Sequence, residues 1–290
     1  MRNIFIEELT AAAKKNKKII LVVNDLGYSV IENFAKQLPN QFFNAGVAEQ
    51  NMIGLASGLA MDGNHVFVYS IGNFPTFRCA EQIRNDIDYH KLPVTIVNVG
   101  GGLGYGSLGY THHSLQDYSL LRVFPNILIA SPCDNMEAKS CIRYLLKHPQ
   151  PSYLRLVKKT NILFHKNLPK VKPGEWKMIK KNKKKEKTFL ITGGTSILLK
   201  DKMLNKKYKD FNIYSLPLWG MKQKLGQSKK IKKWKEIITL EDHFFDGGFG
   251  SWLKESCENV KTKILNEAIS TKVIGKTGNE SYLIKKYFNK

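Results

Sequence analysis

Short apolar runs alternate with longer amphipathic segments along the first half of the chain. The clearest run, 19–23, reads Ile-Ile-Leu-Val-Val and is short enough for a buried strand. Segments with helical spacing, such as 48–61 and 134–147, separate such runs. Strands separated by helices of ten or more residues predict an α/β fold, with a mainly parallel sheet flanked by helices.

The same pattern occurs twice. In the first half it predicts strands over 19–23, 41–44, 65–69, 93–99, 127–131 and 152–157 and helices over 29–38, 48–61, 76–90, 114–123 and 134–147. In the second half it predicts strands over 188–192, 211–215 and 236–240, a turn over 241–250 and a helix over 252–259. Prolines and a lysine run lie between the halves. We therefore predict two domains, 1–160 and 188–290, joined by a linker over 161–187.

The chain is strongly basic, with 46 Lys and Arg against 24 Asp and Glu in 290 residues, a net charge of +22. Only six of the basic residues are arginine, the residue best suited to bidentate phosphate recognition. A solvated lysine-rich surface is therefore favoured over a nucleic-acid interface, and we expect no nucleic-acid partner. An acidic partner subunit or an anionic substrate stays open.

Neither a membrane segment nor a disulfide framework is predicted. No apolar run approaches the ~18 residues of a membrane span, and the N-terminus has no signal-peptide core, so we expect a cytoplasmic protein. The four cysteines form no CxxC pair, which favours free thiols over disulfides or a zinc site.

Two segments carry candidate chemistry. In 43–51 (FNAGVAEQN), Glu49 begins a predicted helix, where a carboxylate is ordinarily a helix-capping residue. In 100–113 (GGGLGYGSLGYTHH), six glycines follow a strand, so the backbone can approach a ligand and its N–H groups can face an anion. It matches neither a Walker loop nor a dinucleotide fingerprint. The closing Thr-His-His lies where open α/β sheets bind ligands, which favours a functional role for a histidine.

Five stretches, in order, resemble the C-terminal half of the transketolase family, which includes 1-deoxyxylulose-5-phosphate synthase. They are 43–60 (FNAGVAEQNMIGLASGLA), 69–84, 109–134 (GYTHHSLQDYSLLRVFPNILIASPCD), 151–158 (PSYLRLVK) and 238–252 (ITLEDHFFDGGFGSW). The resemblance implies a pyrimidine-binding domain for thiamine diphosphate, followed by the family's C-terminal domain.

The family's GDG…N motif, which holds the diphosphate through Mg²⁺, is missing from this sequence. We therefore expect one subunit of a split enzyme, with an N-terminal partner that carries the motif and binds most of the Mg²⁺. The resemblance implies a heterotetramer with two copies of each chain, and no metal ligand in this one.

The resemblance also implies roles for residues at the matching positions. Glu49 would bind the pyrimidine of thiamine and assist the proton removal that activates the cofactor. Phe77 would stack on the pyrimidine, with Phe74 a core neighbour or an alternative stacking residue. His112 would face the substrate and assist proton transfer, and His113 would lie behind it.

Further positions concern the substrate. Ser29 and Lys158 match phosphate-binding positions, although lysine lacks the arginine fork of the family. Arg155 and Arg122 match arginines of the deoxyxylulose-phosphate synthases, and Arg122 could equally form a structural ion pair. His243 lies in a loop that approaches the active-site mouth in some relatives.

The sequence departs from the family pattern at one position that concerns the sugar donor. Leu108 stands where the family has an aspartate that recognises a hydroxyl of that sugar. We expect transfer of a two-carbon ketol unit between sugars or sugar phosphates. A 2-oxoacid-decarboxylating synthase of the deoxyxylulose type and a non-catalytic scaffold subunit are the alternatives. The donor, the acceptor, their phosphorylation and the pathway stay open.

Overall fold

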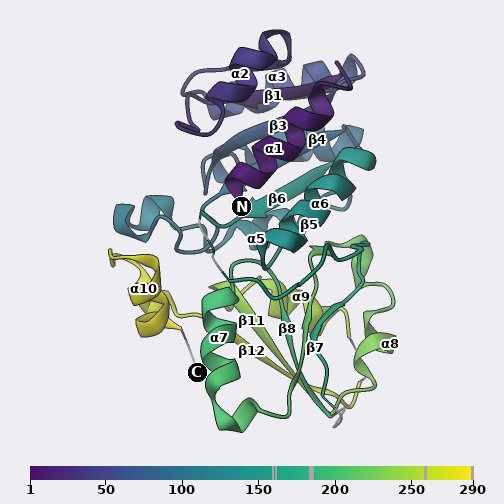
Figure 1. Cartoon of the computed structure of the whole chain (residues 1–290), viewed down its shortest axis with the longest axis vertical. Helices are drawn as coiled ribbons and strands as arrows, with labels where there is room; N and C mark the ends of the chain where they lie inside the picture. Colours follow the sequence, from purple (N-terminus) through teal and green to yellow (C-terminus); the bar gives the residue numbers. More distant parts are fainter. Residues whose placement is uncertain (159, 161, 183–185, 258–259, 289–290) are drawn as a thin grey trace.

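The computed structural model describes residues 1–158, 160, 162–182, 186–257 and 260–288. It consists of two sheets placed end to end along the long axis, each flanked by helices (Figure 1). This arrangement confirms the predicted α/β class with two mainly parallel sheets. No helix among the described residues is both long and apolar enough to cross a membrane.

The first sheet has seven strands in the order β10-β5-β6-β4-β3-β1-β2. Six of them run parallel and come from the first half of the chain: β1 (Ile19–Val23), β2 (Phe42–Asn44), β3 (His65–Ile71), β4 (Val94–Val99), β5 (Leu128–Ala130) and β6 (Ser152–Leu156). The seventh, β10 (Leu218–Trp219), comes from the second half and pairs antiparallel with β5. The two halves of the chain therefore share one sheet.

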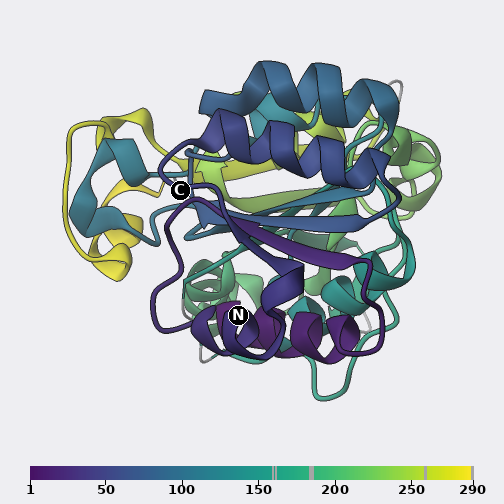
Figure 2. The same cartoon turned by 90° about the horizontal axis from the view of Figure 1, so that it is seen from above.

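Both faces of this sheet are covered, which explains why its strands are continuous apolar runs. Along β1, Ile20 and Val22 pack in the core beneath α3 (Glu49–Met61), whereas alternate residues pack against the helices of the opposite face. Those helices are α1 (Arg2–Ala13), α2 (Glu32–Gln37) and α6 (Asn135–Lys147), and Figure 2 shows helical layers above and below the sheet.

The segment 76–90 and several short helical elements of the first half are less regular. The predicted helix over 76–90 divides into a 3-10 turn, η2 (Phe77–Cys79), a short α4 (Ala80–Gln82) and a π-helical turn, η3 (Ile83–Asp88). Other short elements are η1 (Pro39–Gln41), η4 (Gly106–Leu108), η5 (Tyr110–His112) and α5 (Asp117–Leu121).

The second sheet has five strands in the order β12-β11-β8-β9-β7. They are β7 (Lys177–Lys180), β8 (Lys187–Ile191), β9 (Asn212–Ser215), β11 (Glu236–Phe244) and β12 (Lys263–Ile269), and all except β7 run parallel. The helices of this half are α7 (Ser196–Leu204), η6 (Lys206–Tyr208), η7 (Lys222–Lys224), α8 (Gln227–Ile231), α9 (Phe249–Glu255), η8 (Thr271–Val273) and α10 (Glu280–Tyr287).

Two departures from the prediction concern the predicted linker and the predicted turn of the second half. Strand β7 lies inside the predicted linker, where its backbone pairs with β9 despite lysine-rich side chains, and residues 183–185 of the lysine run lie outside the described part. Strand β11 continues to Phe244, through the first four residues of the predicted turn. Glu241 in this extension is buried and accepts the N–H groups of Phe249 and Gly250 at the start of α9.

A buried ion-pair network joins the two halves. Arg155, at the end of β6, donates from Nε to Asp117 Oδ2 (2.7 Å) and from Nη1 to Asp242 Oδ1 of β11 (2.7 Å). All three side chains are at most 3% exposed. A Cβ atom on Gly102 or Gly194 would lie within 2.6 Å of Asp242 Oδ2, so glycine is required on both sides of this carboxylate.

The C-terminal helix packs against the glycine-rich segment of the first half. The Gly278 N–H donates to the Gly106 carbonyl (3.2 Å), and Leu283 of α10 lies in one apolar cluster with Leu103 and Leu115. Figure 2 shows the yellow C-terminal segment beside a blue-green segment on the same flank of the molecule. The second half therefore supports the loop that carries Thr-His-His.

The network predicts a specific effect on stability. Arg155→Met would leave the carboxylates of Asp117 and Asp242 buried without their cation, so we expect the free energy of unfolding to fall by about 3–5 kcal/mol. Arg143→Met removes an arginine from a more exposed ion pair with Glu8 and should cost about 1 kcal/mol or less. Urea unfolding measures both losses, and equal losses would contradict the assigned importance of the network.

Candidate active site

The carboxyl ends of the parallel strands meet at one edge of the first sheet and bring distant residues together. Asn24 follows β1, Glu49 follows β2, and 72–78 follows β3. The glycine-rich segment follows β4, and Lys158 follows β6. In open α/β sheets, this edge is where ligands bind.

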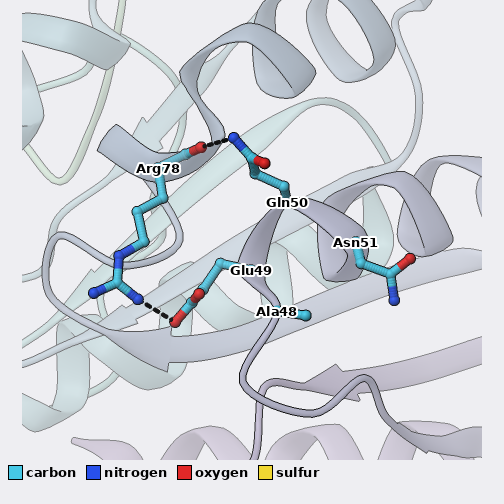
Figure 3. A pocket seen from close by; sticks show the side chains of 5 residues that line it. All are labelled: Ala48, Glu49, Gln50, Asn51 and Arg78. Carbon is cyan, nitrogen blue, oxygen red and sulfur yellow. Dashed lines mark hydrogen bonds and ion pairs between the residues drawn. The ribbon is translucent and has the colours of Figure 1, made fainter.

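Glu49 is the centre of this edge. It is the first residue of α3, and its side chain is only 6% exposed. Its Oε1 atom accepts hydrogen bonds from Asn24 Nδ2 (2.9 Å) and Arg78 Nη1 (2.8 Å), the latter shown in Figure 3. Among the described residues, no hydrogen bond to Oε2 occurs. The residue lines a pocket of about 420 Å³ with Ala48, Gln50, Asn51 and Arg78.

Arg78 connects the carboxylate to the aromatic residues of the 72–78 segment. Its guanidinium carbon lies 4.3 Å from the centre of the Phe74 ring, and Gln50 Nε2 donates to its carbonyl (2.9 Å; Figure 3). Neither Arg78 nor Asn24 was predicted from the sequence as a site residue. They lie 29 and 25 residues from Glu49, and only the order of the strands brings them to it.

His112 packs against the same aromatic ring. Its imidazole meets Phe74 edge-on, with ring centres 5.1 Å apart, and its Nδ1 lies 2.9 Å from Thr111 Oγ1. Burial, followed by the nearby positive charge of Arg78, lowers the pKa of His112 below its usual value of 6.5. The ring is therefore neutral at pH 7 and can accept a proton.

Tyr105 and Lys158 extend this line of contacts. The ring centre of Tyr105 lies 6.4 Å from that of His112, and the Lys158 ammonium lies 4.5 Å from the Tyr105 ring centre. One line of contacts thus runs from Glu49 through Arg78, Phe74, His112 and Tyr105 to Lys158. The structure gathers four of the residues that the sequence singled out: Glu49, Phe74, His112 and Lys158.

Phe77 and Ser29 are exposed at the surface. Phe77 lies in the same 72–78 segment as Phe74, and its side chain is 44% exposed. Ser29 has a φ of +62° in the loop after β1, and its N–H donates to Glu32 Oε1 (2.6 Å). Both side chains are open to contact from outside the chain.

The glycine-rich segment serves internal packing, contrary to the expectation of an anion-binding backbone. The N–H groups of Gly100 and Gly101 donate to Leu156 O, and that of Gly102 donates to Ser114 O. A Cβ on Gly100 would collide with the Tyr105 ring. The glycines therefore admit neighbouring parts of the same chain, and these N–H groups already have partners.

The two arginines assigned to substrate are engaged within the chain. Arg155 is enclosed in the interdomain network. Arg122 donates from both terminal nitrogens to Glu255 (2.8 Å each), the structural ion pair that the sequence left as its alternative. A substrate contact by either guanidinium would compete with these bonds.

Two of the histidines are also fully buried. His113 Nε2 lies 3.3 Å from the Gly106 carbonyl. His243 stacks on Tyr118 with its Nδ1 2.8 Å from Phe244 O, and burial lowers its pKa to about 4. Of these two and His112, only His112 is partly open at the sheet edge.

Comparison with known proteins finds a family model that matches the part of the chain containing this edge. Residues 1–161 match the family model described as transketolase, pyrimidine binding domain. The chain belongs to the transketolase family. The matched residues include β1 to β6 and the entire edge around Glu49.

One curated relative of similar length extends the likeness to the second half. A putative transketolase C-terminal section from Methanocaldococcus jannaschii is 32% identical over 99% of this chain and 91% of its own length. A subunit of the apulose-4-phosphate transketolase of Phocaeicola vulgatus is 40% identical over 53% of this chain and 50% of its own. A 1-deoxy-D-xylulose-5-phosphate synthase of Clostridium kluyveri is 29% identical, and the chain spans only 42% of it.

Solved structures agree with this assignment. A split-gene transketolase described as an inactive β4 tetramer superposes with a TM-score of 0.83 at 27% identity, over 99% of this chain and 92% of that one. The Campylobacter jejuni transketolase superposes with a TM-score of 0.79 at 20% identity and supports the fold alone. This chain spans 44% of it.

The effect of the Arg78 charge on His112 yields a prediction. Arg78→Met removes the nearby positive charge, so the pKa of His112 should rise towards its usual value. Titration of the histidine signals by NMR measures the shift. Arg84→Met, which changes an exposed arginine one turn beyond η2, should leave the His112 pKa in place. An unchanged or lower His112 pKa in Arg78→Met would contradict the described geometry.

Proposed function

We propose that this chain is the C-terminal subunit of a split, thiamine-diphosphate-dependent transketolase that moves a two-carbon ketol unit between sugars or sugar phosphates. The observation that carries the proposal is the buried carboxylate of Glu49, with Oε1 bonded by two side chains and Oε2 left for a ligand. The relatives named as a transketolase subunit and as a transketolase C-terminal section support it.

The residues around Glu49 fit the pyrimidine end of thiamine diphosphate. A carboxylate that must share a proton with a ring nitrogen needs a fixed orientation and little competing water. Asn24 and Arg78 fix its orientation, and the side chain is only 6% exposed at the start of α3, which limits its contact with water. When bound, the cofactor supplies the electron sink that breaks a carbon–carbon bond. Phe77 offers an exposed ring for stacking, with Phe74 as the alternative.

His112 and Lys158 are proposed to act on the substrate. The neutral His112 imidazole can accept a proton from a sugar hydroxyl or donate a hydrogen bond to a carbonyl. Lys158 provides a positive charge for a phosphate, and Ser29 a hydroxyl, at the same edge. The buried Arg155 and His113 and the partly buried Arg122 would support this surface through their contacts within the chain.

A partner subunit would complete the site. The chain lacks the GDG…N motif, so we propose that an N-terminal subunit with this motif binds the diphosphate and most of the Mg²⁺. Two copies of each chain would form a cytoplasmic heterotetramer. A Clostridium protein named "6-deoxy-6-sulfo-D-fructose transketolase subunit SqwH", 25% identical over 99% of this chain, supports a place for such a subunit in an enzyme of an unusual sugar.

Replacing the central carboxylate tests this proposal. In the complex with the N-terminal subunit, Glu49→Gln should lower ketol transfer by about 10²–10⁴-fold, because the amide cannot take up the shared proton. Glu81→Gln, an exposed glutamate of α4, is the matched control and should keep full activity. Circular dichroism checks folding. Wild-type turnover by a folded Glu49→Gln complex would overturn the assignment.

A substitution at Leu108 tests which class of sugar donor the enzyme uses. Leu108 is 55% exposed in η4, so Leu108→Asp should fold and restore an acceptor for a sugar hydroxyl. We expect kcat/KM for ordinary ketose phosphates to rise roughly tenfold or more. Leu225→Asp, at an exposed site outside the edge, should have no effect. Carbon dioxide release from pyruvate by the wild-type complex, without ketol transfer, would instead establish the decarboxylating synthase.

A further inference from the structure

A second cluster of reactive side chains lies away from the Glu49 edge, between the two halves of the chain. Cys133 follows β5, Glu137 lies in the first turn of α6, and His165 lies in the segment that leaves the first sheet. One ligand atom from each residue lies within 4.8 Å of the other two. The exposed fractions of the three residues are 0%, 0% and 9%.

The imidazole of His165 is held with one nitrogen available. Its Nδ1 lies 3.1 Å from Asp134 Oδ2, an oxygen that also accepts the backbone N–H groups of Phe164 and His165 (2.8 Å each). Its Nε2 is buried, and no hydrogen-bond partner for it occurs among the described residues. A carboxylate that fixes one imidazole nitrogen while the other binds a metal is the usual outer shell of a histidine–zinc site.

The carboxylate of Glu137 is also fixed in place. Oε2 accepts the Cys133 N–H (2.8 Å), and Oε1 accepts the hydroxyl of Ser215 from β9. Each carboxylate oxygen can accept more than one bond, so Glu137 can still coordinate through one oxygen. The cluster therefore joins residues of the first sheet, the connecting segment and the second sheet.

The ligand set favours one class of metal. Thiolate, imidazole and carboxylate together suit Zn²⁺, whose ligands lie at about 2.0–2.3 Å and hence roughly 3.4–3.8 Å from one another. Ligand atoms within 4.8 Å need to close by about 1 Å. Water or Ser215 Oγ could supply the fourth position.

We propose that Cys133, Glu137 and His165 bind one Zn²⁺ ion that fastens the connecting segment to the first domain. Binding replaces the thiol proton of Cys133 with a Zn–S bond and releases that proton to solvent. The site is structural and lies outside the proposed catalytic edge. The cysteine spacing gave no sign of it, because one carboxylate and a histidine 32 residues after Cys133 complete the set.

Metal titration of the full-length chain tests this proposal. After chelator treatment, Co²⁺ should bind at one ion per chain with a thiolate-to-cobalt charge-transfer band, and one equivalent of Zn²⁺ should displace it. Cys133→Ala should remove the band, and His165→Gln should weaken Zn²⁺ binding by about 100-fold or more. Cys257→Ala removes another buried thiol and should change neither.

The outcomes separate a metal site from a hydrogen-bonded cluster. A folded wild-type chain without the charge-transfer band, or a band that persists in Cys133→Ala, would overturn the proposal. If Cys133→Ala does not fold, unchanged Zn²⁺ affinity in His165→Gln would do so. Because the readout is metal binding, its failure leaves the transketolase proposal untouched.

Discussion

The position of the Glu49 carboxylate follows from one constraint, the parallel order of β2, β1 and β3. Adjacent parallel strands end at the same edge, so Asn24, Glu49 and Arg78 arrive together although 25 or more residues separate Glu49 from each of the others. Both donors meet Oε1, which orients the carboxylate and leaves Oε2 without a hydrogen-bond donor among the described residues. A buried carboxylate is costly unless it is bonded in this way.

The second half of the chain holds the elements that carry the Glu49 edge in place. Arg155 ties the end of β6 to β11 through Asp242, and β10 extends the first sheet. The glycine-rich segment packs on these same elements and on α10, which fixes the backbone that presents His112. Buried residues such as Arg155 and Asp242 thus hold the elements that carry partly exposed residues such as His112.

Much of the architecture could be predicted from local pattern. Buried runs such as β1 and amphipathic helices such as α3 and α6 lie within one or two residues of their predicted bounds. Strand β10 has only two residues and forms by pairing with a strand about 90 residues earlier, so no local signal marks it. α1, β12 and α10 were likewise not predicted, although α1 covers one face of the first sheet.

The site divides in the same way. Glu49 and His112 lie in motifs that resemble a known family, so the sequence identified them. Arg78 and Asn24 can be recognised as partners of Glu49 only once the order of the strands is known. The glycine run showed the opposite: its composition suggested an anion site, and its N–H groups proved to be satisfied within the chain. The glycine content correctly indicated that other atoms lie close to this backbone. Those atoms belong to the same chain and not to a ligand.

The central claim is that this chain supplies the pyrimidine half of a thiamine diphosphate site completed by another subunit. Calorimetric titration of thiamine diphosphate with Mg²⁺, into this chain alone and into its complex with an N-terminal subunit carrying GDG…N, tests it most directly. We predict saturable binding by the complex, with one cofactor per pair of chains, and none by this chain alone. Absence of binding by the complex, or equal binding without the partner, would contradict the account.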